Sequence, residues 1–76
     1  MKFTVIGSNR TQVEKDDGTR VLVSYSTPVA AYIVGRGYVR SSLYFSKTTT
    51  THINQWLDGA ECETVAQAEI DALVQP

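Results

Sequence analysis

The segment SKTTTTHINQWLDG, residues 46–59, decides how this chain passes from sheet to helix. It begins with hydroxyl side chains, whose oxygens accept the free backbone N–H groups of a first helical turn. Four consecutive threonines suit a cap and first turn better than a helix interior. The sequence leaves three candidates open for the N-cap, namely Ser46, Thr48 and Thr49.

The second half of the segment has helical spacing. Ile53, Trp56 and Leu57 fall on one helical face, which we expect to pack on the sheet. Gly59 suits the left-handed position just beyond a helix C-terminus. The segment therefore predicts a helix over about residues 47–58.

Residues 1–45 are rich in strand patterns, with alternating apolar and polar side chains. Asp17-Gly18 is a hairpin signal, because glycine tolerates the positive φ of such turns. Tyr38–Phe45 is the longest strand pattern, with an apolar face and an aromatic, basic face. The expected strands cover Lys2–Ile6, Thr11–Lys15, Arg20–Tyr25, Val29–Val34 and Tyr38–Phe45.

Thr64-Val65-Ala66-Gln67 has the pattern of a capping box, which predicts a second helix over about residues 64–74. The whole chain, 1–76, is expected to form one domain of the α+β class. Its sheet should be small and mostly antiparallel, with about three to five strands. Two C-terminal helices should pack on one face of that sheet.

Composition excludes several classes of protein. The chain has 76 residues and a formal net charge of −1. No apolar run approaches the length of a membrane span, and the apolar start is too short for a signal peptide. Cys62 is the single cysteine, so neither an internal disulfide nor a cysteine-based zinc site is expected. We expect a cytoplasmic protein with no cofactor, no metal and no membrane partner.

Charge is distributed unevenly along the chain. Residues 18–57 contain basic residues and no acid, whereas residues 58–76 contain acids and no base. Packing of the acidic end beside the basic middle explains this pattern, and an anionic partner for the middle is the alternative.

The candidate partner-binding residues lie in the basic middle. Tyrosine and arginine are enriched in protein interfaces, and the same side chains stack on bases and bind phosphates. The near-zero net charge favours a protein partner over nucleic acid. The candidates are Tyr38, Arg40 and Tyr44 on one strand face, Tyr32 on the neighbouring strand, and Arg36 and Lys47.

Structural roles are expected for Ser46, Thr48, Thr49, His52, Trp56 and Gly59. His52 and Trp56 are one helical turn apart and can stack. A general-base role for His52 is the alternative, but no acid lies nearby on its helical face, so no catalytic residue is expected. An anion at the helix start beside Lys47 is a second alternative, although no glycine-rich phosphate loop is present.

Two segments together resemble a recurring, uncharacterised family of short phage, prophage and bacterial proteins. These are Ser24-Tyr25-Ser26-Thr27-Pro28-Val29-Ala30 and Ser46-Lys47-Thr48-Thr49-Thr50-Thr51-His52. The family pattern is roughly S-Y-x-T-x-V-A followed by S-x-T-T-x-x-H, and the likeness covers residues 20–57. The resemblance implies an origin in a mobile element and no assigned activity.

We therefore expect a small non-enzymatic binding protein that docks on a host or phage protein, as inhibitors and anti-defence proteins of this size do. A nucleic-acid module that uses the Tyr/Arg sheet face is the alternative. Self-association through an exposed sheet edge, giving a homodimer, is compatible with both.

Overall fold

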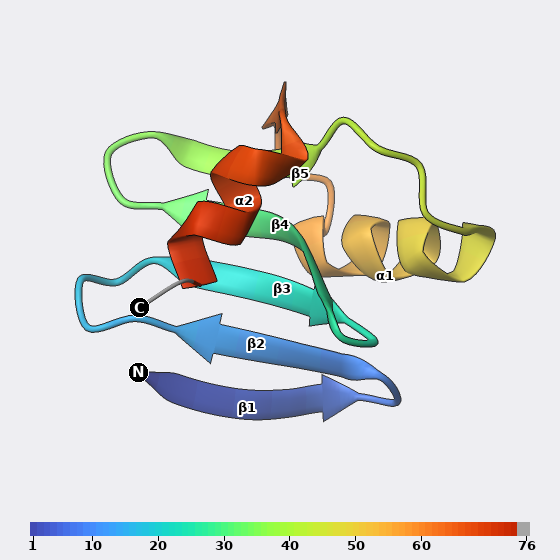
Figure 1. The fold of residues 1–76 in the computed structure, drawn as a ribbon, viewed down its shortest axis with the longest axis horizontal. Helices are drawn as coiled ribbons and strands as arrows, with labels where there is room; N and C mark the ends of the chain where they lie inside the picture. The colour runs from blue at the N-terminus through green and yellow to red at the C-terminus, as the bar shows by residue number, and fades with distance from the viewer. Residues whose placement is uncertain (75–76) are drawn as a thin grey trace.

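The computed structural model describes residues 1–74 and combines one sheet with two helices (Figure 1). The element order is β1 (Lys2–Gly7), β2 (Arg10–Glu14), β3 (Arg20–Ser24), β4 (Thr27–Ile33), β5 (Gly37–Ser41), α1 (Lys47–Leu57), β6 (Cys62–Val65) and α2 (Gln67–Val74). The class is α+β, as the sequence predicts.

The sheet has six strands in the spatial order of the sequence, β1-β2-β3-β4-β5-β6. Strands β1 to β5 pair antiparallel, and β6 pairs parallel with β5. Because a parallel neighbour requires a crossover, α1 connects β5 to β6 across the sheet. The expectation of at most five strands was too low, and the sheet is mixed.

The additional strand, β6, lies where the sequence predicts the start of the second helix. Cys62–Val65 pairs with Tyr38–Ser41, and the helix begins only at Gln67. The Gln67 side chain does not close a capping box, since its Nε2 donates to the Pro28 carbonyl oxygen at 2.7 Å and to Asp71 Oδ1 at 2.9 Å. Glutamate and threonine fit a first helical turn locally, but pairing with β5 decides the conformation of this segment.

The two helices pack on opposite faces of the sheet, which corrects the expectation of one shared face. Two consecutive residues of β3 show this. Val21 belongs to the core that contains Ile70 of α2, whereas Leu22 packs with Ile53 of α1. Figure 1 shows α2 in front of the sheet. Both sheet faces are apolar along β3 and β4, so each requires its own covering layer.

Strand β5 is shorter than the predicted Tyr38–Phe45 strand. It ends at Ser41, whose Oγ accepts the Leu43 N–H at 3.1 Å and so fixes a turn. Leu43 and Tyr44 beyond it are exposed in a loop. The alternation that the sequence shows over residues 42–45 therefore does not correspond to two faces of a strand.

Helix α1 confirms the prediction made from its sequence. Ser46 is the N-cap, and its Oγ accepts the Thr49 N–H at 3.1 Å. Asp58 and Gly59 both adopt positive φ, at 50° and 80°, beyond the last turn. Within residues 1–74, neither helix is long and apolar enough to cross a membrane.

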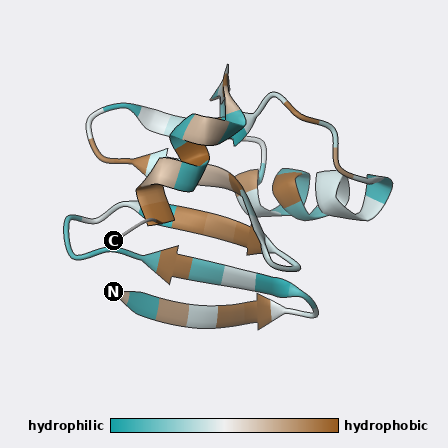
Figure 2. Ribbon diagram, viewed as in Figure 1, coloured by the Kyte–Doolittle hydropathy of each residue, from teal (hydrophilic) through white to brown (hydrophobic). Residues whose placement is uncertain are grey.

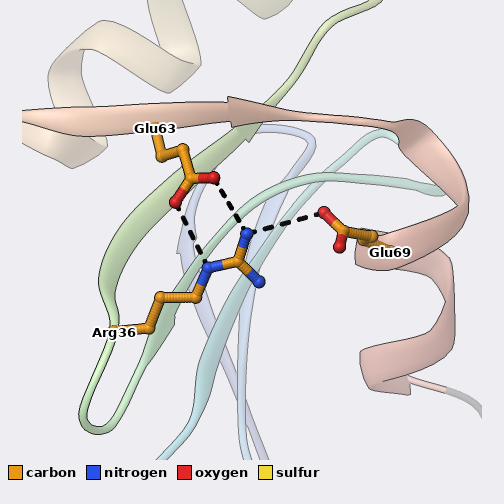
Figure 3. Close-up of polar contacts among 3 residues, drawn as sticks. All are labelled: Arg36, Glu63 and Glu69. Carbon is orange, nitrogen blue, oxygen red and sulfur yellow. Dashed lines mark hydrogen bonds and ion pairs between the residues drawn. The ribbon is translucent and has the colours of Figure 1, made fainter.

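An ion-pair network at the β4–β5 turn joins the turn to β6 and α2. Arg36 Nη2 lies 3.1 Å from Glu63 Oε2 and 3.7 Å from Glu69 Oε2, and Arg36 Nε donates to Glu63 Oε1 at 3.3 Å (Figure 3). The hydrogen bonds from Arg36 and its positive charge lower the pKa of Glu63. The Arg36 guanidinium is thereby engaged within the fold.

This network gives a pH-dependent stability. A carboxyl group whose pKa is lower in the folded state stabilises the fold above its unfolded-state pKa of 4.5, and this contribution is lost as pH falls through the folded-state value. We expect Arg36→Gln to lower the urea midpoint slightly at pH 7, since exposed ion pairs contribute little. At pH 3 the two proteins should unfold at nearly the same urea concentration. An equal difference at both pH values would contradict the role of Glu63 ionisation.

Candidate functional site

The predicted partner-binding residues do not form one free surface. Tyr38 is half-buried beneath α1, with its ring centroid 5.6 Å from that of Trp56 and 4.9 Å from that of Tyr32. Arg20 covers the other side of this aromatic row, because its Cζ lies 4.8 Å from the Tyr32 ring centroid. The row therefore serves as the support on which the C-terminal half of α1 packs.

The remaining predicted residues are dispersed. Arg40 Nη1 donates to Asn54 Oδ1 of α1 at 3.5 Å, and Arg36 is held by the acids of β6 and α2. Tyr44 is exposed in the β5–α1 loop, and Lys47 is exposed at the first residue of α1. Because α1 covers the face that carries Tyr38 and Arg40, these side chains do not provide an open stacking platform.

Three side chains from the two sequence segments, Ser24, Thr49 and His52, form a polar cluster between β3 and α1. Ser24 Oγ lies 2.9 Å from His52 Nδ1 and 3.1 Å from Thr49 Oγ1, and all three side chains are buried. Tyr25, with a positive φ of 58°, packs its ring against His52 at a centroid distance of 6.1 Å. The cluster attaches the N-terminal half of α1 to the end of β3. The aromatic partner of His52 is therefore Tyr25, whereas the helical spacing suggests Trp56.

The chemistry open to this cluster is limited by burial. Ser24 is 2% exposed, so a substrate cannot reach its hydroxyl. No carboxylate in residues 1–74 hydrogen-bonds to His52, so a base oriented by an acid is not present there. These distances fit a polar contact that positions α1.

A hollow of about 400 Å³ opens beside the buried cluster. We call it the basic hollow, and it is lined by Arg10, Lys47, Thr48, Thr51, His52 and Gln55. Arg10 extends from the start of β2 to α1, where its Nη1 donates to Gln55 Oε1 at 2.6 Å. The lining of the basic hollow contains two cationic side chains, Arg10 and Lys47, and no carboxylate.

The outer strand β1 exposes a row of apolar side chains. Phe3 is 68% and Val5 is 78% exposed, although both lie on the sheet face that α2 covers elsewhere. Figure 2 shows hydrophobic residues along β1 at the edge of the sheet. Within residues 1–74 only β2 pairs with this strand, so its other edge is open.

Comparison with known families supplies an identification but no activity. A family model described as "Family of unknown function (DUF8033)" matches residues 1–72. The chain belongs to this family. The match extends well beyond residues 20–57, over which the sequence resemblance was drawn. The comparisons with curated proteins and with solved structures found no significant match.

Sequence reasoning missed the residues that the fold brings to α1 from the first hairpin. Arg10 lies forty-five positions from Gln55 in the chain, and no local pattern relates the two. Ser24 and His52 were both quoted in the sequence segments, but their contact depends on β3 and α1 lying side by side. The sequence also does not predict that Phe3 and Val5 are exposed, because an alternating pattern indicates that the apolar face of a strand is buried.

Proposed function

We propose that this member of the family is a non-enzymatic binding protein that docks on another protein through the open edge of β1. The observation that carries the proposal is the exposure of Phe3 and Val5 on an unpaired outer strand. Such an edge presents free backbone N–H and C=O groups and is a ready template for another strand.

The alternation along β1 specifies the partner's chemistry. Phe3 and Val5 point to the α2 face, whereas Lys2 and Thr4 point to the other face. A partner segment in extended conformation would continue the ladder by backbone hydrogen bonds and set apolar side chains beside Phe3 and Val5. The opposite edge of the sheet suits this less, since β6 has only four residues and its Glu63 is engaged by Arg36.

Charge favours a different protein over a second copy. Lys2 forms no ion pair within residues 1–74, although Glu14 is its register partner. Pairing of two β1 strands about Thr4 would set Lys2 opposite Ile6 and provide no carboxylate. A partner strand with an acid at that position would both extend the ladder and neutralise Lys2.

The proposal includes a mobile-element origin, action as an inhibitor, and a location inside the host cell. The sequence pattern of residues 24–30 and 46–52 supports the origin, and the free Cys62 suits a reducing compartment. Burial of Ser24 and the absence of an acid bonded to His52 within residues 1–74 support a non-enzymatic role.

The alternative, a nucleic-acid module on the Tyr/Arg sheet face, has less support. Tyr38 and Tyr32 pack against each other, and Tyr38 also packs against Trp56. A base would have to displace α1 to stack on them.

Val5→Lys tests the docking proposal. The test first identifies a host protein by capture and then measures its affinity for purified wild type and variant. Loss of one buried valine contact is worth about 1.5–3 kcal/mol, so we expect binding to weaken about ten- to a hundredfold. Hydrogen exchange should also show that the outward-facing β1 amides become protected in the complex.

Val34→Lys is the matched control, because Val34 is also an exposed valine, at 59%, and lies in the turn after β4. Binding should be unchanged in this variant. If Val5→Lys bound as tightly as wild type, β1 would not be the docking surface. If light scattering showed that wild type is a dimer and Val5→Lys is a monomer, the partner at the β1 edge would be a second copy of this chain.

A further inference from the structure

We propose that the basic hollow binds the phosphate group of a small molecule, either free phosphate or a phosphomonoester. This inference concerns a site on the α1 face and does not depend on the docking proposal for β1. It rests on three features of the hollow: its uncompensated cations, the way Arg10 is held, and the donor character of its lining.

The cations of the hollow have no counter-charge. Neither Arg10 nor Lys47 forms an ion pair within residues 1–74. An adjoining hollow shares Arg10, His52 and Gln55 and includes Asp58, but that acid does not line the basic hollow. An anion seated between Arg10 and Lys47 would neutralise both.

Arg10 is built into the fold and does not extend freely into solvent. Its guanidinium lies against Gly7, where even a Cβ atom would overlap Arg10 Nη2. Its Nη1 is fixed by Gln55, and its Nε is shielded from solvent without a hydrogen-bond partner in the described part of the chain. Holding an arginine in this way with no carboxylate leaves its positive charge uncompensated, and a phosphate bound beside the guanidinium would offset that cost.

The rest of the lining offers hydrogen-bond donors. His52 lines the hollow, and its Nδ1 lies 2.9 Å from Ser24 Oγ. A tautomer in which Nδ1 accepts the Ser24 hydroxyl proton would leave the Nε2–H as a donor for a ligand. The hydroxyl of Thr48 and the amide NH₂ of Gln55 add two further donors. Arg10 and Lys47 supply the charge, and phosphate oxygens accept from several donors at once.

Titration followed by NMR tests the site. Inorganic phosphate and adenosine monophosphate are added separately at constant ionic strength, and the backbone amides of Lys47, His52 and Gln55 are monitored. Both ligands should shift the NMR resonances of these amides. Adenosine, added as a control without a phosphate, should not shift them. Response to the monophosphate alone would indicate that the nucleoside contributes, and response to both would assign recognition to the phosphate.

Variants identify the residues involved. Lys47→Gln should weaken phosphate binding at least about tenfold, as expected for one charge-assisted contact. Gly7→Ala retains every charge but displaces the Arg10 guanidinium, so it should weaken binding similarly. Lys2→Gln removes a cation from β1 and should leave the titration unchanged.

The opposing results are equally definite. No shift at any phosphate concentration, with a spectrum that shows folded protein, would overturn the proposal. Equal losses of phosphate affinity in Lys47→Gln and Lys2→Gln would show that binding depends on net charge and not on the hollow. Shifts produced by an oligonucleotide and not by the two small ligands would replace a small-molecule site with a nucleic-acid surface.

Discussion

Replacing Ser24 by alanine is expected to lower the free energy of unfolding by about 2–4 kcal/mol. The Ser24 hydroxyl contacts His52 Nδ1 and Thr49 Oγ1, and all three groups are buried. Alanine would leave two buried polar atoms without a partner, and each such atom costs about 1–3 kcal/mol. Urea unfolding followed by the fluorescence of Trp56 measures the loss.

The control for this variant is Ser26→Ala. Ser26 is an exposed serine in the turn after β3, and its replacement should change stability by less than about 0.5 kcal/mol. A loss of similar size in both variants would show that the buried contact is not the cause.

A double-mutant cycle separates the contact from its surroundings. Combining Ser24→Ala with His52→Leu removes both partners, so the double variant should be more stable than the sum of the two single losses predicts. We expect a coupling energy of about 1–2 kcal/mol. Strict additivity would mean that Ser24 and His52 stabilise the fold independently.

Replacing Ile70 by alanine is expected to cost about 2–5 kcal/mol. Ile70 is fully buried and is the buried residue of α2, which has only eight residues. Total stability for a chain of 76 residues is about 4–11 kcal/mol by the usual value per residue. The variant should therefore be at the margin of folding, as its thermal unfolding would show.

Ile70→Val keeps the test informative if the alanine variant does not fold. It removes one methylene and should cost about 0.5–1.5 kcal/mol, and Ala72→Ser on the exposed side of α2 serves as control. Hydrogen exchange should show protection lost in α2 while α1, on the other face, retains its own. Equal losses in both helices would mean that α2 opens only when the whole domain unfolds.

The candidate sites show where sequence reasoning reaches its limit. The segment 46–59 predicts α1 well, because capping and helical spacing are local properties. The same local reasoning predicts a helix start at Thr64, where tertiary pairing with β5 forms a strand. Local patterns also predict an exposed sheet face around Tyr38, because they do not indicate that α1 crosses to that side of the sheet, where Trp56 packs on Tyr38.

The sequence by itself determined the α+β class, the Asp17-Gly18 turn with its positive φ, the Ser46-to-Gly59 helix and a near-neutral charge. Each depends on residues close together in the chain. Tertiary structure alone decided that β6 joins the sheet, that the helices take opposite faces, and that Arg10 meets α1 while Phe3 and Val5 stay exposed. These features depend on contacts between distant residues, whose energies exceed local preferences and leave no periodic signal in the chain.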